Sequence, residues 1–251
     1  MKPVARVAPL LLALLVLAAC GSRGKDDPIL SLSAAESLAE GKRLMAEERW
    51  SQARPYLSHA FEVEPNSAAG REALLMVADS LFFEKGEANL IQAEAKYRDF
   101  QNRFPTSDKA PYVQFQIANA LAQRIERPDR DQASTAKALT AYEDLMRLYP
   151  TSEYAEKAQA EIVRVRSTLA EHEYQVGRFY LRYGLPVAAS LRLEGLLARY
   201  PDYTEKDKAL LHLGLAYRAA KRDDDAQATF SKLKSDFPDS PWIKKIPKEK
   251  G

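Results

Sequence analysis

The sequence predicts an all-α protein built as a solenoid of about five helix–turn–helix repeats. Strand signals are missing, because apolar and polar residues do not alternate and no Asn-Gly or Asp-Gly hairpin turn occurs. Long stretches of Ala, Leu, Glu, Lys, Arg and Gln instead carry apolar residues three and four positions apart, which is the spacing of an amphipathic helix. A short proline-containing motif also recurs at intervals along the chain, which indicates an internal repeat.

The recurring motif is an apolar or aromatic segment that ends in proline and is followed by Asn, Thr or Asp. It is centred on Pro65, Pro105, Pro150, Pro201 and Pro238. Proline lacks a backbone N–H and clashes with the preceding turn, so each of these residues should end a helix. A Ser or Asp shortly after the proline can cap the helix that follows. We therefore expect each motif to separate one repeat from the next.

Three of the repeats share one spacing. Gly41, Gly177 and Gly214 each precede a motif proline by 24 positions. The same offsets from these glycines hold packing residues in all three repeats: Leu44, Ala53, Leu57 and Ala60; Tyr180, Ala189, Leu193 and Leu196; Tyr217, Ala226, Phe230 and Leu233. This is the tetratricopeptide pattern, in which small residues let two antiparallel helices approach and larger residues fill the space between neighbours.

Two further repeats fit with insertions, and a long helix separates the repeats into two lobes. Ala78, Ala93 and Tyr97 lead to Pro105, and Ala118, Ala138 and Tyr142 lead to Pro150, with extra residues at 84–89 and 124–135. Residues 153–182 contain no helix-breaking residue except Gly177, which predicts one helix of about 30 residues, roughly 45 Å long. We expect repeats 1–3 in an N-terminal lobe over residues 34–152. The long helix and repeats 4–5 should form a C-terminal lobe over residues 153–240.

The N-terminus predicts export and a lipid anchor. Residues 1–19 combine an early positive charge, a short apolar run and small residues, as a cleaved signal peptide does. Leu17-Ala18-Ala19-Cys20 resembles a lipobox, and Cys20 is the single cysteine of the chain. That resemblance implies acylation at Cys20. The absence of an Asp directly after the cysteine favours anchoring at the outer membrane of a Gram-negative bacterium, at its periplasmic face. Residues 20–33 then read as a lipidated tether and residues 241–251 as a basic, frayed tail.

The composition argues against catalysis and against nucleic-acid binding. Without the signal peptide the chain is formally neutral, which gives no electrostatic reason to bind nucleic acid. His59, His172 and His212 are scattered over three repeats, and none has a second His or Cys at metal-ligand spacing. No Gly-rich phosphate loop or nucleophilic serine motif occurs. We expect no enzyme activity, no metal and no cofactor.

Several segments together resemble the BamD family, lipoproteins of the β-barrel assembly machinery. They are the Asp129-Arg130-Asp131 insertion, residues 164–174, residues 179–184, and the run from Arg192 to Asp202. The resemblance implies a scaffold that binds the periplasmic POTRA domains of the insertase BamA and unfolded outer-membrane β-barrel proteins, along with other lipoproteins of that machinery. It also implies that Arg192, with Glu194 and Gly195, contributes to the BamA contact.

A substrate groove is predicted from the repeat register. In a tetratricopeptide repeat, first-helix positions that are not used for packing line the concave surface. Here those positions hold Leu38, Met45, Leu75, Asp79, Phe82, Phe83, Tyr112, Phe115 and Asn119. This aromatic strip could receive an extended barrel strand. Phe82 and Phe83 are adjacent and cannot both face the groove, so one of them could belong to the core instead.

Two other function classes share some of these sequence features. A periplasmic tetratricopeptide adaptor of the Tol–Pal or cell-division type is the main alternative. Such proteins typically carry an N-terminal coiled coil and lack a lipobox, and no heptad segment precedes Ala34. A lipoprotein that hydrolyses the cell wall is disfavoured because the sequence lacks a catalytic set.

Overall fold

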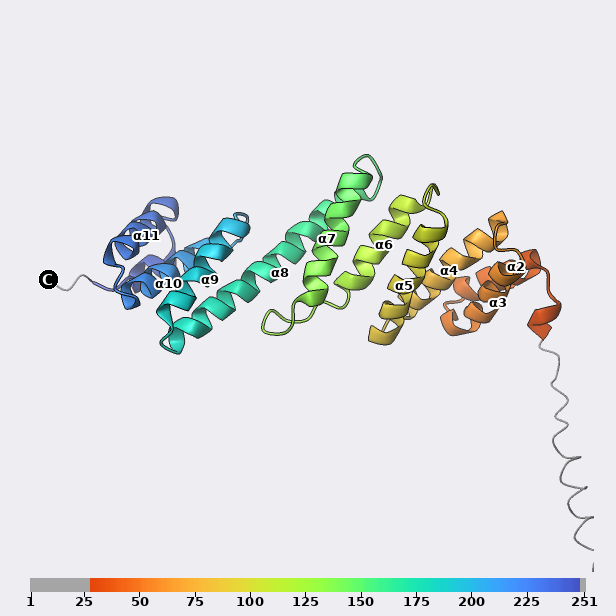
Figure 1. Cartoon of the computed structure of the whole chain (residues 1–251), viewed down its shortest axis with the longest axis horizontal. Coiled ribbons are helices and arrows are strands. Elements are labelled where there is room, and N and C mark those ends of the chain that lie inside the picture. The colour runs from red at the N-terminus through yellow and green to blue at the C-terminus, as the bar shows by residue number, and fades with distance from the viewer. Residues whose placement is uncertain (1–27, 249–251) are drawn as a thin grey trace, which may run out of the picture. The chain divides into compact units, whose positions relative to one another are not determined.

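The computed structural model describes residues 28–248, which form α-helices and short 3-10 helices and no strand. Figure 1 shows the helices in chain order. They are α2 (Ala34–Ala46), α3 (Trp50–Val63), α4 (Ala68–Glu84), α5 (Glu87–Arg103), α6 (Ala110–Ala122), α7 (Ala133–Leu148), α8 (Ala155–Arg182), α9 (Pro186–Arg199), α10 (Lys206–Ala219) and α11 (Asp223–Asp236). The 3-10 helices are η2 (Pro28–Ser31) and η3 (Pro241–Lys245). Paired in sequence order, the ten α-helices of the described residues confirm the all-α fold of five helical repeats.

The chain divides into two compact units, and each is described by itself. The first ends at Ala73 and contains α2, α3 and the start of α4, and the second begins at Leu74. Within the second unit each helix from α5 to α11 packs against the next in sequence. This division falls well before residue 152, and the lobe boundaries stated above stay a prediction.

Close helix–helix approach explains the repeated glycines. A Cβ atom added to Gly41 would lie 2.5 Å from Cδ2 of Leu57, and one added to Gly214 would lie 2.3 Å from Cε1 of Phe230. Gly177 is in the same position, with Cγ of Leu193 at 2.8 Å. Carbon atoms in van der Waals contact are about 3.5–4.0 Å apart, so no side chain fits at these positions without a shift. The shared offsets of the three repeats are therefore packing contacts between the two helices of a hairpin.

The motif prolines end helices as predicted. The C-cap residues of α3, α5, α7, α9 and α11 are Glu64, Phe104, Tyr149, Tyr200 and Phe237. Each immediately precedes a motif proline, and a proline disfavours helical conformation in the residue before it.

Helix α8 is the predicted long helix, with 28 residues from Ala155 to Arg182. It packs against both α7 and α9 (Figure 1). It also contributes Ala170 and Tyr174 to the core that it shares with α9, α10 and α11. The helix is thus long enough to take part in two successive layers of the second unit.

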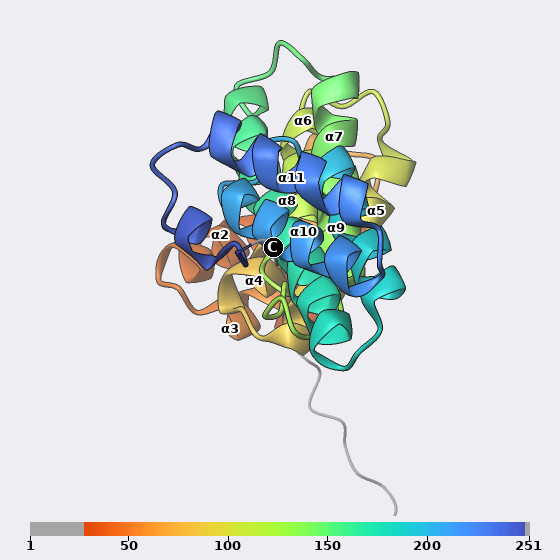
Figure 2. The same ribbon diagram turned by 90° about the vertical axis from the view of Figure 1, so that its left-hand side faces the viewer.

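Both ends of the described chain are more ordered than predicted. Pro28–Ser31, within the expected tether, forms η2, and Ser33 caps α2 through a capping box with Glu36. The expectation of a frayed tail is wrong for its first half, because Pro241–Lys245 forms η3. Trp242, Ile243 and Ile246 pack against the core of the last repeats. Figure 2 views the molecule from the side of α10 and α11, and this segment follows α11 in the chain.

The predicted signal peptide and Cys20 lie outside the described residues. Between residues 28 and 248, no helix combines the length and the apolar composition needed to span a bilayer.

Candidate functional site

The predicted strip contains a carboxylate held by two tyrosines. Asp79 lies on α4 and accepts hydrogen bonds at Oδ1 from the hydroxyls of Tyr97, at 2.6 Å, and Tyr112, at 2.7 Å. These tyrosines come from α5 and α6, so one carboxylate oxygen ties three helices together. Burial raises the pKa of the Asp79 carboxyl above its usual value, and the two tyrosine hydrogen bonds act in the opposite direction.

Polar side chains extend this contact along α6 to α7. Gln116 donates from Nε2 to the Tyr112 hydroxyl at 3.1 Å and accepts at Oε1 from Asn119 Nδ2 at 2.7 Å. Asn119 in turn accepts a hydrogen bond from the Tyr142 hydroxyl at 2.7 Å. The result is a continuous hydrogen-bonded chain, which we call the Asp79 network: Asp79, Tyr97, Tyr112, Gln116, Asn119 and Tyr142.

Aromatic rings flank the Asp79 network. The ring of Tyr154 lies 5.8 Å from that of Tyr112 and 5.3 Å from that of Phe115, between centroids. Phe115 also lies 6.1 Å from the ring of Tyr142. Tyr112, Phe115 and Tyr154 each keep part of their surface exposed. The arrangement offers ring faces beside fixed hydrogen-bonding groups, which suits an extended peptide with alternating side chains.

The structure separates the predicted groove residues into three kinds. Leu75 and Phe82 are buried, each at 8% exposure, as is Leu38 in the first unit. Phe83 is 42% exposed, and its ring contacts that of Phe82 edge-on at 5.5 Å. Asp79, Tyr112, Phe115 and Asn119 are partly exposed and belong to the Asp79 network or to the rings beside it.

Sequence reasoning overlooked several members of this cluster. Tyr97 and Tyr142 were placed as packing residues, yet each uses its hydroxyl to bond a residue of the strip. A tyrosine at a packing position that phenylalanine could fill was the available signal, because a buried hydroxyl needs a partner. For Gln116 and Tyr154 we find no such signal.

The predicted BamA-contact residues lie on α9 and are engaged within the chain. Arg192 Nη1 lies 3.3 Å from Oε2 of Glu173 on α8, and Arg199 pairs with the other oxygen at 2.9 Å. Glu194 accepts a hydrogen bond from the Tyr217 hydroxyl at 2.6 Å. Arg192 still has about half of its side chain exposed, at 46%.

Several exposed apolar side chains occur in the segment of the chain just before Arg192. They lie around the turn from α8 to α9, where Gly184 has a φ of 73°. The set comprises Phe179, Tyr183, Leu185, Val187 and Leu191, each between 48% and 63% exposed. No acidic residue occurs between Glu173 and Glu194. Exposed apolar clusters of this kind mark interaction surfaces.

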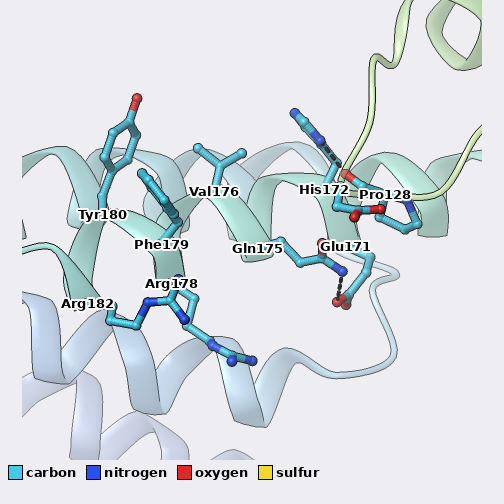
Figure 3. A pocket seen from close by; sticks show the side chains of 10 residues that line it. Pro128, Glu171, His172, Gln175, Val176, Arg178, Phe179, Tyr180 and Arg182 are labelled. Atoms are coloured by element: carbon cyan, nitrogen blue, oxygen red, sulfur yellow. Dashed lines mark hydrogen bonds between the residues drawn. The ribbon is translucent and has the colours of Figure 1, made fainter.

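A cavity of about 530 Å³ lies along α8 beside the loop that follows α6. His172 Nδ1 donates to the Pro128 carbonyl at 2.6 Å, and Gln175 Nε2 donates to Glu171 at 3.0 Å. In Figure 3, His172, Val176 and Tyr180 point to one side of α8, and Arg178 and Arg182 point to the other. Glu171 also accepts a hydrogen bond from the Tyr203 hydroxyl. The acidic and imidazole groups are thus engaged in structural contacts.

Across residues 28–248, no three His, Cys, Asp or Glu side chains are grouped so that they could hold a metal ion. The candidate sites described above are formed by rings, amides and a few charges.

Comparison with known proteins identifies the family. The model of the outer membrane lipoprotein family YfiO matches residues 32–233. The chain belongs to this family. The match runs from the residue before the N-cap of α2 to the last turn of α11, so it spans all five repeats.

Members of the family in other bacteria cover most of the chain. The outer membrane protein assembly factor BamD of Caulobacter vibrioides is 27% identical over 242 residues, which are 96% of this chain and 78% of the relative. BamD of Rickettsia prowazekii is 28% identical over 242 residues, 96% of this chain and 95% of its own. BamD of Neisseria gonorrhoeae is 26% identical over 252 residues, 97% and 94% of the two chains.

Among solved structures, the TPR2AB-domain:pHSP90 complex of yeast Sti1 is similar over 84% of this chain and 80% of its own. The identity is 16% and the TM-score is 0.43.

Proposed function

We propose that this protein is an outer-membrane lipoprotein of the β-barrel assembly machinery, which binds BamA and unfolded barrel proteins. The observation that carries the proposal is membership of the outer membrane lipoprotein family over residues 32–233. Relatives that span nearly the whole chain are outer membrane protein assembly factors. The protein acts as a scaffold without catalysis.

Three parts of the chain divide this work. Acylated Cys20 holds the protein at the periplasmic face of the outer membrane. The surface around Arg192, Glu194 and Gly195, with the apolar residues of the α8–α9 turn, contacts the POTRA domains of BamA. The partly exposed rings Tyr112 and Phe115 and the amide of Asn119 receive an extended segment of the client.

Two features support the proposed BamA surface: its exposed apolar area, and a carboxylate, Glu173, that pairs with two arginines. Glu173 is only 11% exposed and pairs with two arginines, so removing one guanidinium leaves it compensated by the other. Arg192 can therefore exchange toward a carboxylate of the partner while Arg199 keeps Glu173 paired. The neighbouring exposed side chains, such as Leu191 and Val187, supply area that gains free energy when a partner covers it.

Affinity purification of the protein from its native envelope tests the proposal. We expect BamA to be recovered with the wild-type chain and to be depleted when Leu191→Asp disrupts the apolar surface. Val163→Asp is the matched control. Val163 lies on α8 and, like Leu191, is exposed, at 52%, but it lies outside the proposed surface. If BamA is not recovered with the wild-type chain, the protein does not act in this machinery.

A further inference from the structure

Asp79 is a largely enclosed carboxylate that no cation in the described part of the chain compensates. It takes part in no ion pair within residues 28–248, and its hydrogen bonds come from tyrosine hydroxyls alone. In contrast, Glu173 pairs with two arginines. Enclosing a charge without a counter-charge costs desolvation free energy. Hydrogen bonds from the two neutral tyrosine hydroxyls offset only part of that cost.

One oxygen of this carboxylate is uncommitted. Both tyrosine hydroxyls donate to Oδ1, and no hydrogen bond to Oδ2 occurs in the described part of the chain. Oδ2 is also not among the fully buried side-chain atoms that lack a partner there. It therefore keeps some solvent-accessible surface, through which a group outside the chain can contact it.

The aromatic rings beside Asp79 also favour a cationic ligand. Tyr112 donates its hydroxyl to the carboxylate, and its ring lies 5.8 Å from that of Tyr154, between centroids. The face of an aromatic ring attracts a cation. The chain itself uses this attraction at the outer edge of the cluster, where Lys157 Nζ lies 5.4 Å from the centre of the Tyr154 ring.

From these observations we infer that Asp79, with the rings of Tyr112 and Tyr154, binds an arginine or lysine side chain of the extended client segment. The inference rests on the proposed function and adds a charge requirement to it. A cation at Oδ2 supplies the missing counter-charge, and its alkyl stem packs on the rings. An anionic side chain is repelled at this place, and an apolar side chain would remove the carboxylate from water without compensation.

A charge cycle between protein and peptide tests the inference. The probes are synthetic peptides of about twelve residues that alternate apolar and polar residues and end in phenylalanine. In one series a single arginine occupies each polar position in turn, and in the other it is replaced by glutamine. Affinities are measured by fluorescence anisotropy for the full-length mature protein and for Asp79→Asn, which keeps an oxygen that both tyrosines can bond.

We expect one register of the arginine series to bind the wild-type protein at least about tenfold more tightly than its glutamine counterpart, and Asp79→Asn to abolish that difference. Asp144→Asn is the matched control, because Asp144 lies on α7, pairs with Arg147 of the same helix and is not part of the Asp79 network. It should leave the difference unchanged.

The outcomes separate this inference from the function on which it rests. If every arginine peptide binds the wild-type protein no better than its glutamine counterpart, the charge requirement is overturned while client binding stands. If the preference persists in Asp79→Asn, the cation binds elsewhere and the inference is also overturned. If neither series binds, the client-binding part of the proposed function fails as well.

Discussion

Replacing Gly214 by alanine tests whether close helix approach holds the last repeat together. The added Cβ would lie 2.3 Å from Cε1, 2.7 Å from Cδ1 and 2.8 Å from Cζ of Phe230. Three atoms of one rigid ring are thus about 0.7–1.2 Å too close, judged by a contact distance of about 3.5 Å. The ring is 2% exposed and belongs to the core of the C-terminal helices, so it cannot turn out into solvent.

Two effects of opposite sign decide the magnitude. Alanine is favoured over glycine in a helix interior by about 1 kcal/mol. Overpacking a well-filled core costs typically about 1–3 kcal/mol, and a clash with a ring should lie toward the upper end. We expect a net loss of about 1–2 kcal/mol, which in a chain of this size lowers the melting temperature by roughly 2–8 °C.

Thermal melting followed by far-ultraviolet circular dichroism measures this effect, with Gly195→Ala as the control. Gly195 lies in the middle of α9, and its added Cβ would meet only the flexible end of Arg199, at 3.3 Å. The control should gain stability from helix propensity alone. The opposite signs of the two changes separate packing from propensity.

A double-mutant cycle completes the test. In a Phe230→Ala background the ring is absent, so Gly214→Ala should become neutral or stabilising. The reasoning is refuted if Gly214→Ala stabilises the wild-type chain as much as Gly195→Ala does, or if its effect is the same with and without the ring.

Four further predictions concern the candidate sites. Cys20→Ser should prevent acylation, which mass spectrometry of the mature N-terminus checks, and unacylated Cys20 in native material would contradict the anchor. Arg192→Gln should reduce recovery of BamA while lowering stability by less than about 1 kcal/mol, because Arg192 is half exposed and Arg199 keeps Glu173 paired; unchanged recovery would remove Arg192 from the contact. Phe115→Ala should weaken crosslinking to a barrel peptide with a stability loss well below the ~3–5 kcal/mol of a buried phenylalanine, and a loss of that full size would make it a core residue. Because burial raises the pKa of Asp79, the folded state holds the proton more tightly than the unfolded state, so this group's contribution to stability is present at acid pH and is lost as the pH rises through the folded-state pKa. Asp79→Asn should therefore melt higher than the wild type at neutral pH and converge with it below about pH 4, and equal melting temperatures at both would show that the charge is not costly.

The fold could be predicted because its rules act over short distances in sequence. A proline ends its own helix, and a glycine meets a residue at a fixed offset in the same hairpin, as Gly177 meets Leu193. Three copies of the same spacing made that reading specific. The prediction of a frayed tail is wrong for its first half because it rests on the lysines and prolines of this segment. The apolar residues Trp242, Ile243 and Ile246, which pack against the core, were the contrary signal.

The candidate site could be predicted only in part, because it depends on contacts between repeats. The register placed Asp79, Tyr112 and Asn119 on one surface, but it could not show that Tyr97 and Tyr142 reach into it with their hydroxyls. These bonds join residues that are 18 and 23 positions apart, across helices whose rotation is set by packing. The same distance in sequence concealed the partner of Arg192, which lies 19 positions earlier.

The two enclosed carboxylates of the second unit point to different roles. Glu173 stands between α8 and α9 with an arginine on each oxygen, an arrangement that keeps its charge at low cost and fixes the hairpin beside the proposed BamA surface. Asp79 has the same need and no cation within residues 28–248, although arginine is abundant in the chain. A fold that required only stability would be served as well by asparagine at this position, since the tyrosine hydroxyls need an acceptor and not a charge. The negative charge of Asp79 therefore serves the binding of a cation from outside the chain. The free-energy cost of burying this charge is relieved when that cation binds, so it adds to the affinity.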